Sequence, residues 1–158
     1  MKLIAGTGLN LTSVAPGDLD GADRLMAHWA EIKCSHVEIS ARRLDVVLGG
    51  KLNMPATKRV AAMIDRHGMA PVLHAPHGIN LMDRDRRDMH VGAAEASIEF
   101  CRITGCKSMV MHSGNVSLTE WIYDSEALLA EQRDLLKRLG DLEEKANVNL
   151  SVENLIAH

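Results

Sequence analysis

Two histidines and one glutamate each stand at the end of a short, largely apolar run. These runs are Pro71–His74, Ser108–His112 and Asn149–Glu153. Imidazole nitrogen and carboxylate oxygen are the usual ligands of zinc and manganese sites. If the runs are parallel strands, their carboxyl ends meet at one edge of a sheet, where the side chains converge. We therefore expect His74, His112 and Glu153 to form a divalent-metal site.

Histidines on strands can also have a purely structural role. A single histidine on a strand is more often a hydrogen-bonded core residue than a ligand. Three candidates at equivalent strand ends bring the metal-site interpretation level with that alternative. The four histidines that lie on or beside predicted helices are expected at the solvated surface: His28, His36, His67 and His90.

Candidate substrate contacts surround the predicted site. His77 and Asn80 lie in the loop after the first of the three strands, and Asn115 lies in the loop after the second. Their small neighbours and amide groups could contact a polyol or a phosphate. Glu38 stands two residues before the end of a further strand-like run. On an inward-facing position it would be a substrate or metal-site residue, and it would otherwise be solvated.

The chain alternates strand-like runs with segments of helical period. Strands are expected over residues 2–8, 36–40, 71–74, 108–112 and 149–153, and helices over about 18–33, 53–68 and 85–104 and from about 125. Asp18 or Asp20 is available as a cap of the first helix, Pro55 suits the first turn of the second, and Gly68 is a natural stop. This alternation predicts βαβ units and a parallel sheet, within one domain over residues 1–158.

Composition narrows the class of protein. The 158 residues are 46% hydrophobic and 25% charged, as in a globular chain, and the net charge of −3 gives no general attraction to nucleic acid or membrane. No run approaches a membrane span, and the N-terminus lacks the pattern of a signal peptide. Three cysteines without Cys-x-x-Cys spacing favour reduced thiols, and so a cytoplasmic protein.

At this point the sequence resembles the xylose-isomerase-like barrel superfamily. It includes sugar and sugar-phosphate isomerases and epimerases, inosose dehydratases and the endonuclease IV class of DNA repair enzymes. The resemblance covers essentially the whole chain. It is carried, in the family's order, by VLHAPHGINL (72–81), MVMHSG (109–114) and LSVEN (150–154).

The resemblance implies an α/β fold, the N-terminal part of a (β/α)8 TIM barrel with about five strands and four helices. Glu153 resembles the family carboxylate that ligates a metal (Mn, Zn, Mg or Co) and, in the isomerase branch, can also move a substrate proton. His74 and His112 resemble the zinc-binding histidines of the endonuclease branch. In isomerase-like members, histidines at these places line the substrate pocket instead.

The function implied is a metal-dependent isomerase or epimerase of carbohydrate metabolism, acting on a small sugar or polyol by proton transfer through an enediolate. One alternative is an endonuclease IV-like zinc phosphodiesterase acting on abasic DNA, although the acidic balance disfavours nucleic acid. Another is a non-catalytic fragment or assembly subunit. The family's remaining ligands come from strands six to eight, beyond this chain. We therefore expect a longer polypeptide, or a homo-oligomer joined through open edges and an exposed apolar inner face.

Overall fold

A five-stranded parallel sheet forms the centre of the protein, whose computed structural model describes residues 8–153. The strand order β1-β2-β5-β6-β7 follows the chain, so each crossover joins neighbouring strands, as predicted. The strands are β1 (Gly8–Asn10), β2 (His36–Ser40), β5 (Ala70–His74), β6 (Ser108–His112) and β7 (Asn149–Glu153). The last four match the predicted runs to within one residue. The first was predicted over 2–8, of which 2–7 lie outside the described residues.

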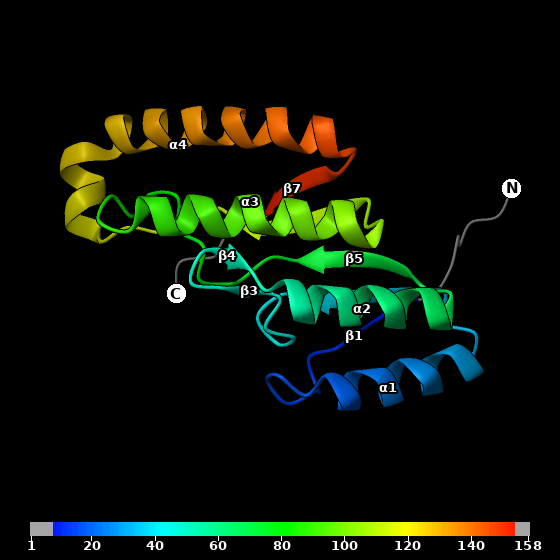
Figure 1. Cartoon of the computed structure of the whole chain (residues 1–158). Coiled ribbons are helices and arrows are strands. Elements are labelled where there is room, and N and C mark those ends of the chain that lie inside the picture. Colours follow the sequence, from blue (N-terminus) through cyan, green and yellow to red (C-terminus); the bar gives the residue numbers. More distant parts are fainter. Residues whose placement is uncertain (1–7, 154–158) are drawn as a thin grey trace, which may run out of the picture.

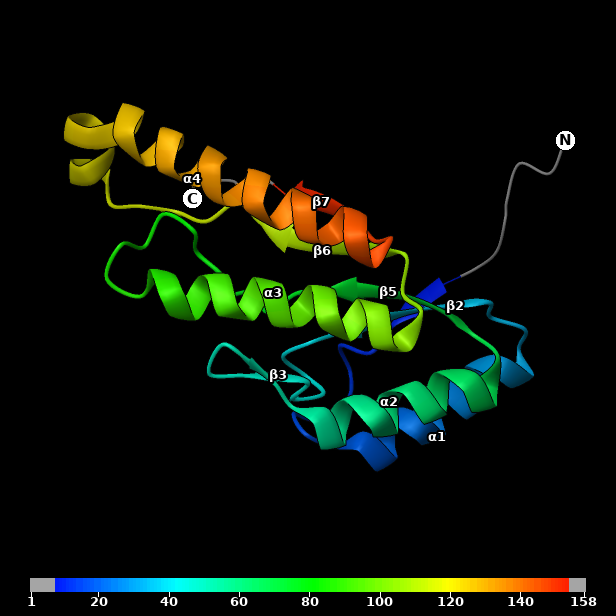
Figure 2. The same ribbon diagram turned by 45° about the horizontal axis from the view of Figure 1, so that its top comes forward.

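Four helices lie side by side in chain order along one side of the sheet (Figures 1 and 2). They are α1 (Leu19–Glu31), α2 (Met54–His67), α3 (Arg87–Thr104) and α4 (Leu118–Ala146). Asp18 caps α1 by accepting the N–H of Gly21, and Asn53 caps α2, which ends at left-handed Gly68. These boundaries follow from capping chemistry that the sequence shows directly. No helix in residues 8–153 is long and apolar enough to span a membrane.

The two faces of the sheet differ in character because successive strand residues point to opposite sides. One face packs against the helices, and its side chains are buried: Val37, Ile39, Leu73, Met109 and Met111. The other face, called the open face below, is half-buried to exposed apart from the buried Ser40. On β2, β5, β6 and β7 its members are His36, Glu38, Ser40, Ala70, Val72, His74, Ser108, Val110, His112, Asn149, Ser151 and Glu153. The expectation of an exposed apolar inner face is therefore wrong, because most of these side chains are polar.

Two elements differ from the prediction. Helix α4 begins at Leu118 and not near residue 125, because Ser117 and Glu120 form a capping box. Its first turns were missed because their apolar side chains are exposed and give no core-facing period, as at Ile122 (63%) and Tyr123 (83%). The structure also adds an antiparallel hairpin of β3 (Val47–Leu48) and β4 (Lys51–Leu52). Its strands are too short for an alternating pattern.

Two of the four histidines expected at the solvated surface are instead bonded to carboxylates. Nε2 of the buried His90 lies 3.3 Å from Asp83, and Nε2 of His67 lies 2.7 Å from Asp23. The prediction was wrong for both because each histidine has a carboxylate partner: Asp23 lies 44 residues before His67, and Asp83 lies seven residues before His90, in the loop that leads into α3. His28 is solvent-exposed, as expected.

Candidate metal centre

His74, His112 and Glu153 occupy the carboxyl ends of three neighbouring strands, β5, β6 and β7. His112 and Glu153 are direct register partners, and His74 is paired with Val110, two residues before His112. Paired residues share a face and residues two apart do too, so all three side chains stand on the open face. The parallel sheet thus brings together residues that are distant in the sequence.

The donor atoms of these residues are close enough to share one ion. Nε2 of His74 and Nε2 of His112 each lie 3.7 Å from Oε2 of Glu153, and all three donor atoms lie within 4.8 Å of one another. Two atoms bound tetrahedrally to one ion at about 2.1 Å lie about 3.4 Å apart. Small side-chain adjustments would therefore bring all three donor atoms within bonding distance of one ion and leave at least one coordination position open. Within residues 8–153, this is the only such group of three or more His, Cys, Asp or Glu side chains.

Backbone carbonyls orient both imidazole rings. Nδ1 of His74 lies 3.0 Å from the carbonyl oxygen of Ala75, and Nδ1 of His112 lies 3.3 Å from that of His77. A carbonyl oxygen only accepts, so in each neutral ring Nδ1 carries the hydrogen and Nε2 keeps a lone pair. That lone pair belongs to the nitrogen nearer Glu153. The rings therefore present metal-binding nitrogens where the geometry requires them.

His77 lies against His74 and His112, the two histidines of the candidate site. Its ring centroid is 4.3 Å from that of His74 and 5.0 Å from that of His112. Desolvation lowers the pKa of His77, the neighbouring His74, His112 and Arg42 lower it further, and the negative charge of Glu153 opposes them. A neutral imidazole at the edge of the metal centre can donate to or accept from a substrate hydroxyl.

The other predicted contact residues occupy different places. Glu38 shares the open face, but lies two residues before the strand end, about 7 Å further down the sheet. Asn80 and Asn115 bridge the two loops above the site: the Nδ2 of Asn80 donates to the main-chain carbonyl of Asn115. Glu38 is therefore placed for contacts deeper in the fold, and Asn80 has its polar atoms turned toward another loop.

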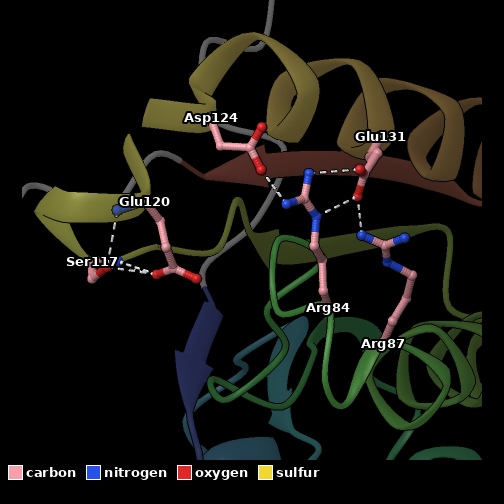
Figure 3. Close-up of polar contacts among 6 residues, drawn as sticks. All are labelled: Arg84, Arg87, Ser117, Glu120, Asp124 and Glu131. Carbon is pink, nitrogen blue, oxygen red and sulfur yellow. Dashed lines mark hydrogen bonds and ion pairs between the residues drawn. The ribbon is translucent and has the colours of Figure 1, made fainter. Parts of the chain in front are cut away.

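An ion-pair cluster holds the loop after β5 against α4 (Figure 3). Arg84 donates two hydrogen bonds to Glu131, at 3.1 and 2.7 Å, and one to Asp124, and Arg87 also donates to Glu131. The acidic partners lie at least 40 residues away along the chain, so the sequence gives no local signal for this cluster.

The sequence did not predict that the main-chain carbonyls of Ala75 and His77 orient the two imidazole rings. A main-chain acceptor carries no residue-type signal, so no pattern in the sequence identifies it. The only hint was position, since both residues directly follow the strand that ends at His74.

Comparison with known proteins gives a sequence-family match. The chain matches the model described as xylose isomerase-like TIM barrel over residues 26–158. No curated protein matches the chain.

Several solved structures share the fold. A D-tagatose 3-epimerase-like protein is 19% identical with a TM-score of 0.76, over 97% of this chain and 54% of that chain. A xylose isomerase-like TIM barrel protein from Mycobacterium smegmatis, in complex with magnesium, is 12% identical with a TM-score of 0.68, over 93% and 54%. Endonuclease IV from Thermus thermophilus is 16% identical with a TM-score of 0.62, over 97% and 53%. The chain thus spans about half the length of these structures.

Proposed function

Because this chain belongs to the xylose isomerase-like TIM barrel family, we propose that it carries the metal-binding part of a sugar or sugar-phosphate epimerase or isomerase. The observation that supports this most is the meeting of His74, His112 and Glu153 at the ends of three parallel strands. Carboxyl ends of parallel barrel strands are where such folds place their active sites. Of the four metals named above, zinc, manganese and cobalt would suit the donor set of two imidazoles and one carboxylate, whereas magnesium prefers oxygen ligands.

The proposed chemistry is proton transfer next to a carbonyl group. A divalent ion at this site would polarise the hydroxy-carbonyl oxygen of the sugar and acidify the adjacent C–H. Glu153 removes that proton, and its return after the enediolate forms completes the exchange. Its side chain is 55% exposed, which leaves it accessible to a bound substrate. Inversion at carbon also needs a group on the opposite side of the substrate, which we assign to the rest of a full barrel.

A small polyhydroxy substrate fits the surroundings of the site. The open face is mainly polar, and His77, Glu38 and Asn115 offer donors and acceptors for hydroxyl groups. We assign these three residues to substrate contacts, and leave out Asn80 because its amide is bonded to the neighbouring loop. The D-tagatose 3-epimerase-like protein makes ketohexoses the first substrates to test.

A zinc phosphodiesterase of the endonuclease IV kind is the second candidate. Two histidines among three donors favour it, since histidine-rich sets suit zinc. The charge distribution disfavours it, because DNA binding depends on neutralising phosphates. The chain has a net charge of −3, and Arg84 and Arg87 at the loop after β5 are already paired with Asp124 and Glu131.

Solvent-hydrogen exchange would test the proposed reaction. The 158-residue chain, and a full-length barrel containing it, would be loaded in turn with Mn, Zn, Mg or Co and incubated with a panel of ketohexoses and their phosphates in D2O. We expect deuterium at the carbon next to the carbonyl, detected by NMR, with the full barrel and not with a Glu153→Gln version. Stoichiometric metal without exchange or phosphodiesterase activity would support the third possibility, a non-catalytic or assembly role.

The chain's context is part of the proposal. We assign residues 1–158 to one partial-barrel domain that works within a longer chain or a homo-oligomer. The three cysteines are free, which supports a reducing compartment such as the cytoplasm.

A further inference from the structure

Two loops begin directly after the histidine ligands and meet above the site. One covers residues 75–86 after β5, and the other covers residues 113–117 after β6. Asn80 joins them with its side-chain amide. Its Nδ2 donates to the main-chain oxygen of Asn115 at 2.6 Å and to the Oδ1 of Asn115 at 3.3 Å. Its Oδ1 accepts the N–H groups of Met82 at 3.1 Å and of Asn115 at 3.2 Å.

These four contacts use the full hydrogen-bonding capacity of the Asn80 amide, two donated hydrogens and two acceptor positions. The backbone partners also fix its orientation, since N–H groups need the oxygen and a carbonyl needs the nitrogen. A substrate would have to displace one of these bonds in order to bind Asn80. The geometry therefore points to a structural task for this side chain.

Gly114 shows how closely the two loops approach each other. Its φ is +93°, and a Cβ at this position would lie 2.3 Å from Oδ1 of Asn80. Both the backbone conformation and the available space therefore favour glycine. The loop after β6 is thus shaped to receive the Asn80 amide.

The same loop orients a histidine ligand. The carbonyl oxygen of His77, three residues before Asn80, lies 3.3 Å from Nδ1 of His112. This acceptor comes from a different strand–loop unit than His112, so its place depends on how the two loops are joined. The corresponding acceptor for His74 is the carbonyl oxygen of Ala75, the next residue in the chain. Its position therefore does not depend on the contact between the two loops.

We propose that Asn80 is a positioning residue that, by joining these loops, holds the His77 carbonyl against His112 and fixes the ring with Nε2 free for metal. The inference rests on the proposed metal site, because holding Nε2 free matters only if that nitrogen binds a metal. What it predicts directly is that the hydrogen of the neutral His112 ring is on Nδ1, and this can be measured without metal.

The test is the histidine tautomer, read from long-range ¹H–¹⁵N NMR spectra of the full chain at a pH of about 8.5, where imidazoles of ordinary pKa are neutral. In the wild type, we expect the Nδ1–H pattern for both His74 and His112. In Asn80→Ala and Asn80→Asp, we expect His112 to lose that pattern while His74 keeps it. Asn80→Asp retains the acceptor oxygens, loses the donated bonds and adds a negative charge that faces the oxygens of Asn115, so it breaks the joint and serves if the alanine variant does not fold.

Asn53→Ala is the matched control. Asn53 also bridges loop backbone groups, donating to the carbonyl oxygen of Asp45 at 2.9 Å, but does so at the start of α2. It should lower the melting temperature and leave both histidine patterns intact. A folded Asn80→Asp protein that keeps the Nδ1–H pattern of His112 would overturn the inference.

Zinc titration separates this inference from the proposed function. If the wild type binds zinc, we expect Asn80→Asp to bind it about 10- to 100-fold more weakly, as for other residues that orient a ligand. If the wild type does not bind zinc, the proposed metal site fails, while the tautomer measurement still decides the role of Asn80.

Discussion

His112 and Glu153 are register partners across β6 and β7, and Nε2 of His112 lies 3.7 Å from Oε2 of Glu153. The parallel sheet fixes this relationship, because both residues end their strands at the same level. Nε2 of His74 is equally far from the same oxygen. Glu153 therefore joins the two histidines, and its carboxylate is the group whose removal should matter most.

We predict that Glu153→Gln weakens divalent-metal binding by more than about 100-fold, since loss of a mere supporting partner already costs 10- to 100-fold. Isothermal titration with Zn²⁺ and Mn²⁺ would measure the change. Glu126→Gln, an exposed position on α4, is the control and should bind as the wild type does. Equal affinity of the Glu153 and Glu126 variants would remove Glu153 from the site.

Substitutions of the adjacent β5 residues Leu73 and His74 should have opposite effects on stability and metal affinity, because their side chains point to opposite faces of the sheet. Leu73 is fully buried against the helices, and its replacement by Ala should cost about 2–5 kcal/mol of unfolding free energy. Metal affinity of the folded protein should hardly change. His74→Ala should do the reverse, with a large loss of metal affinity and a smaller loss of stability. Urea denaturation and metal titration of both variants would show whether β5 has this register.

The ion-pair cluster on α4 should make stability depend on acid pH. Hydrogen bonds from Arg84 and Arg87 lower the pKa of Glu131 to about 2 from 4.5. A carboxylate with a lowered pKa stabilises the fold above its ordinary pKa, and this contribution is lost as the pH falls from about 4.5 through 2. The wild-type melting temperature should therefore fall more steeply over this window than that of Glu131→Gln. Parallel curves for the two proteins would show that the cluster contributes nothing.

The sheet has edges at β1 and β7 among the described residues. On β7, the N–H of Leu150 donates to Glu143 at 2.8 Å, which protects one position, while Val152 is 41% exposed. Unpaired strand edges promote association. We expect the 158-residue chain by itself to show a mass above 17.3 kDa in light scattering. A monomer with a cooperative thermal transition would count against this expectation.

The two proposed enzyme classes differ in their attraction to DNA. Because the chain carries a net charge of −3 and Arg84 and Arg87 are already paired with acidic side chains, we expect weak binding to an abasic-site duplex even at low salt. Fluorescence anisotropy across a salt series would measure this. Tight binding that weakens steeply with salt would favour the phosphodiesterase.

Much of the fold could be predicted from sequence, because its signals are local. Caps such as Asp18 and Asn53, the left-handed stop at Gly68 and the apolar strand runs each reveal themselves within a few residues. The convergence of His74 and His112 with Glu153 could also be anticipated, since strand order and strand end together define the place.

What could not be predicted depends on partners far along the chain. The bond of His67, the ion pairs of Arg84 and the loop contacts of Asn80 all join segments at least 35 residues apart. Predicting that the open face is polar would have required the strand register. A shift of one residue would exchange the side chains of the open face for those of the core face.

The most direct test of the central claim is a crystal structure of the protein grown with zinc, with anomalous data collected at the zinc absorption edge. We predict one strong anomalous peak about 2.0–2.2 Å from Nε2 of His74, Nε2 of His112 and a carboxylate oxygen of Glu153. A peak bound to other residues, or none at the ends of β5, β6 and β7 at saturating zinc, would contradict the account.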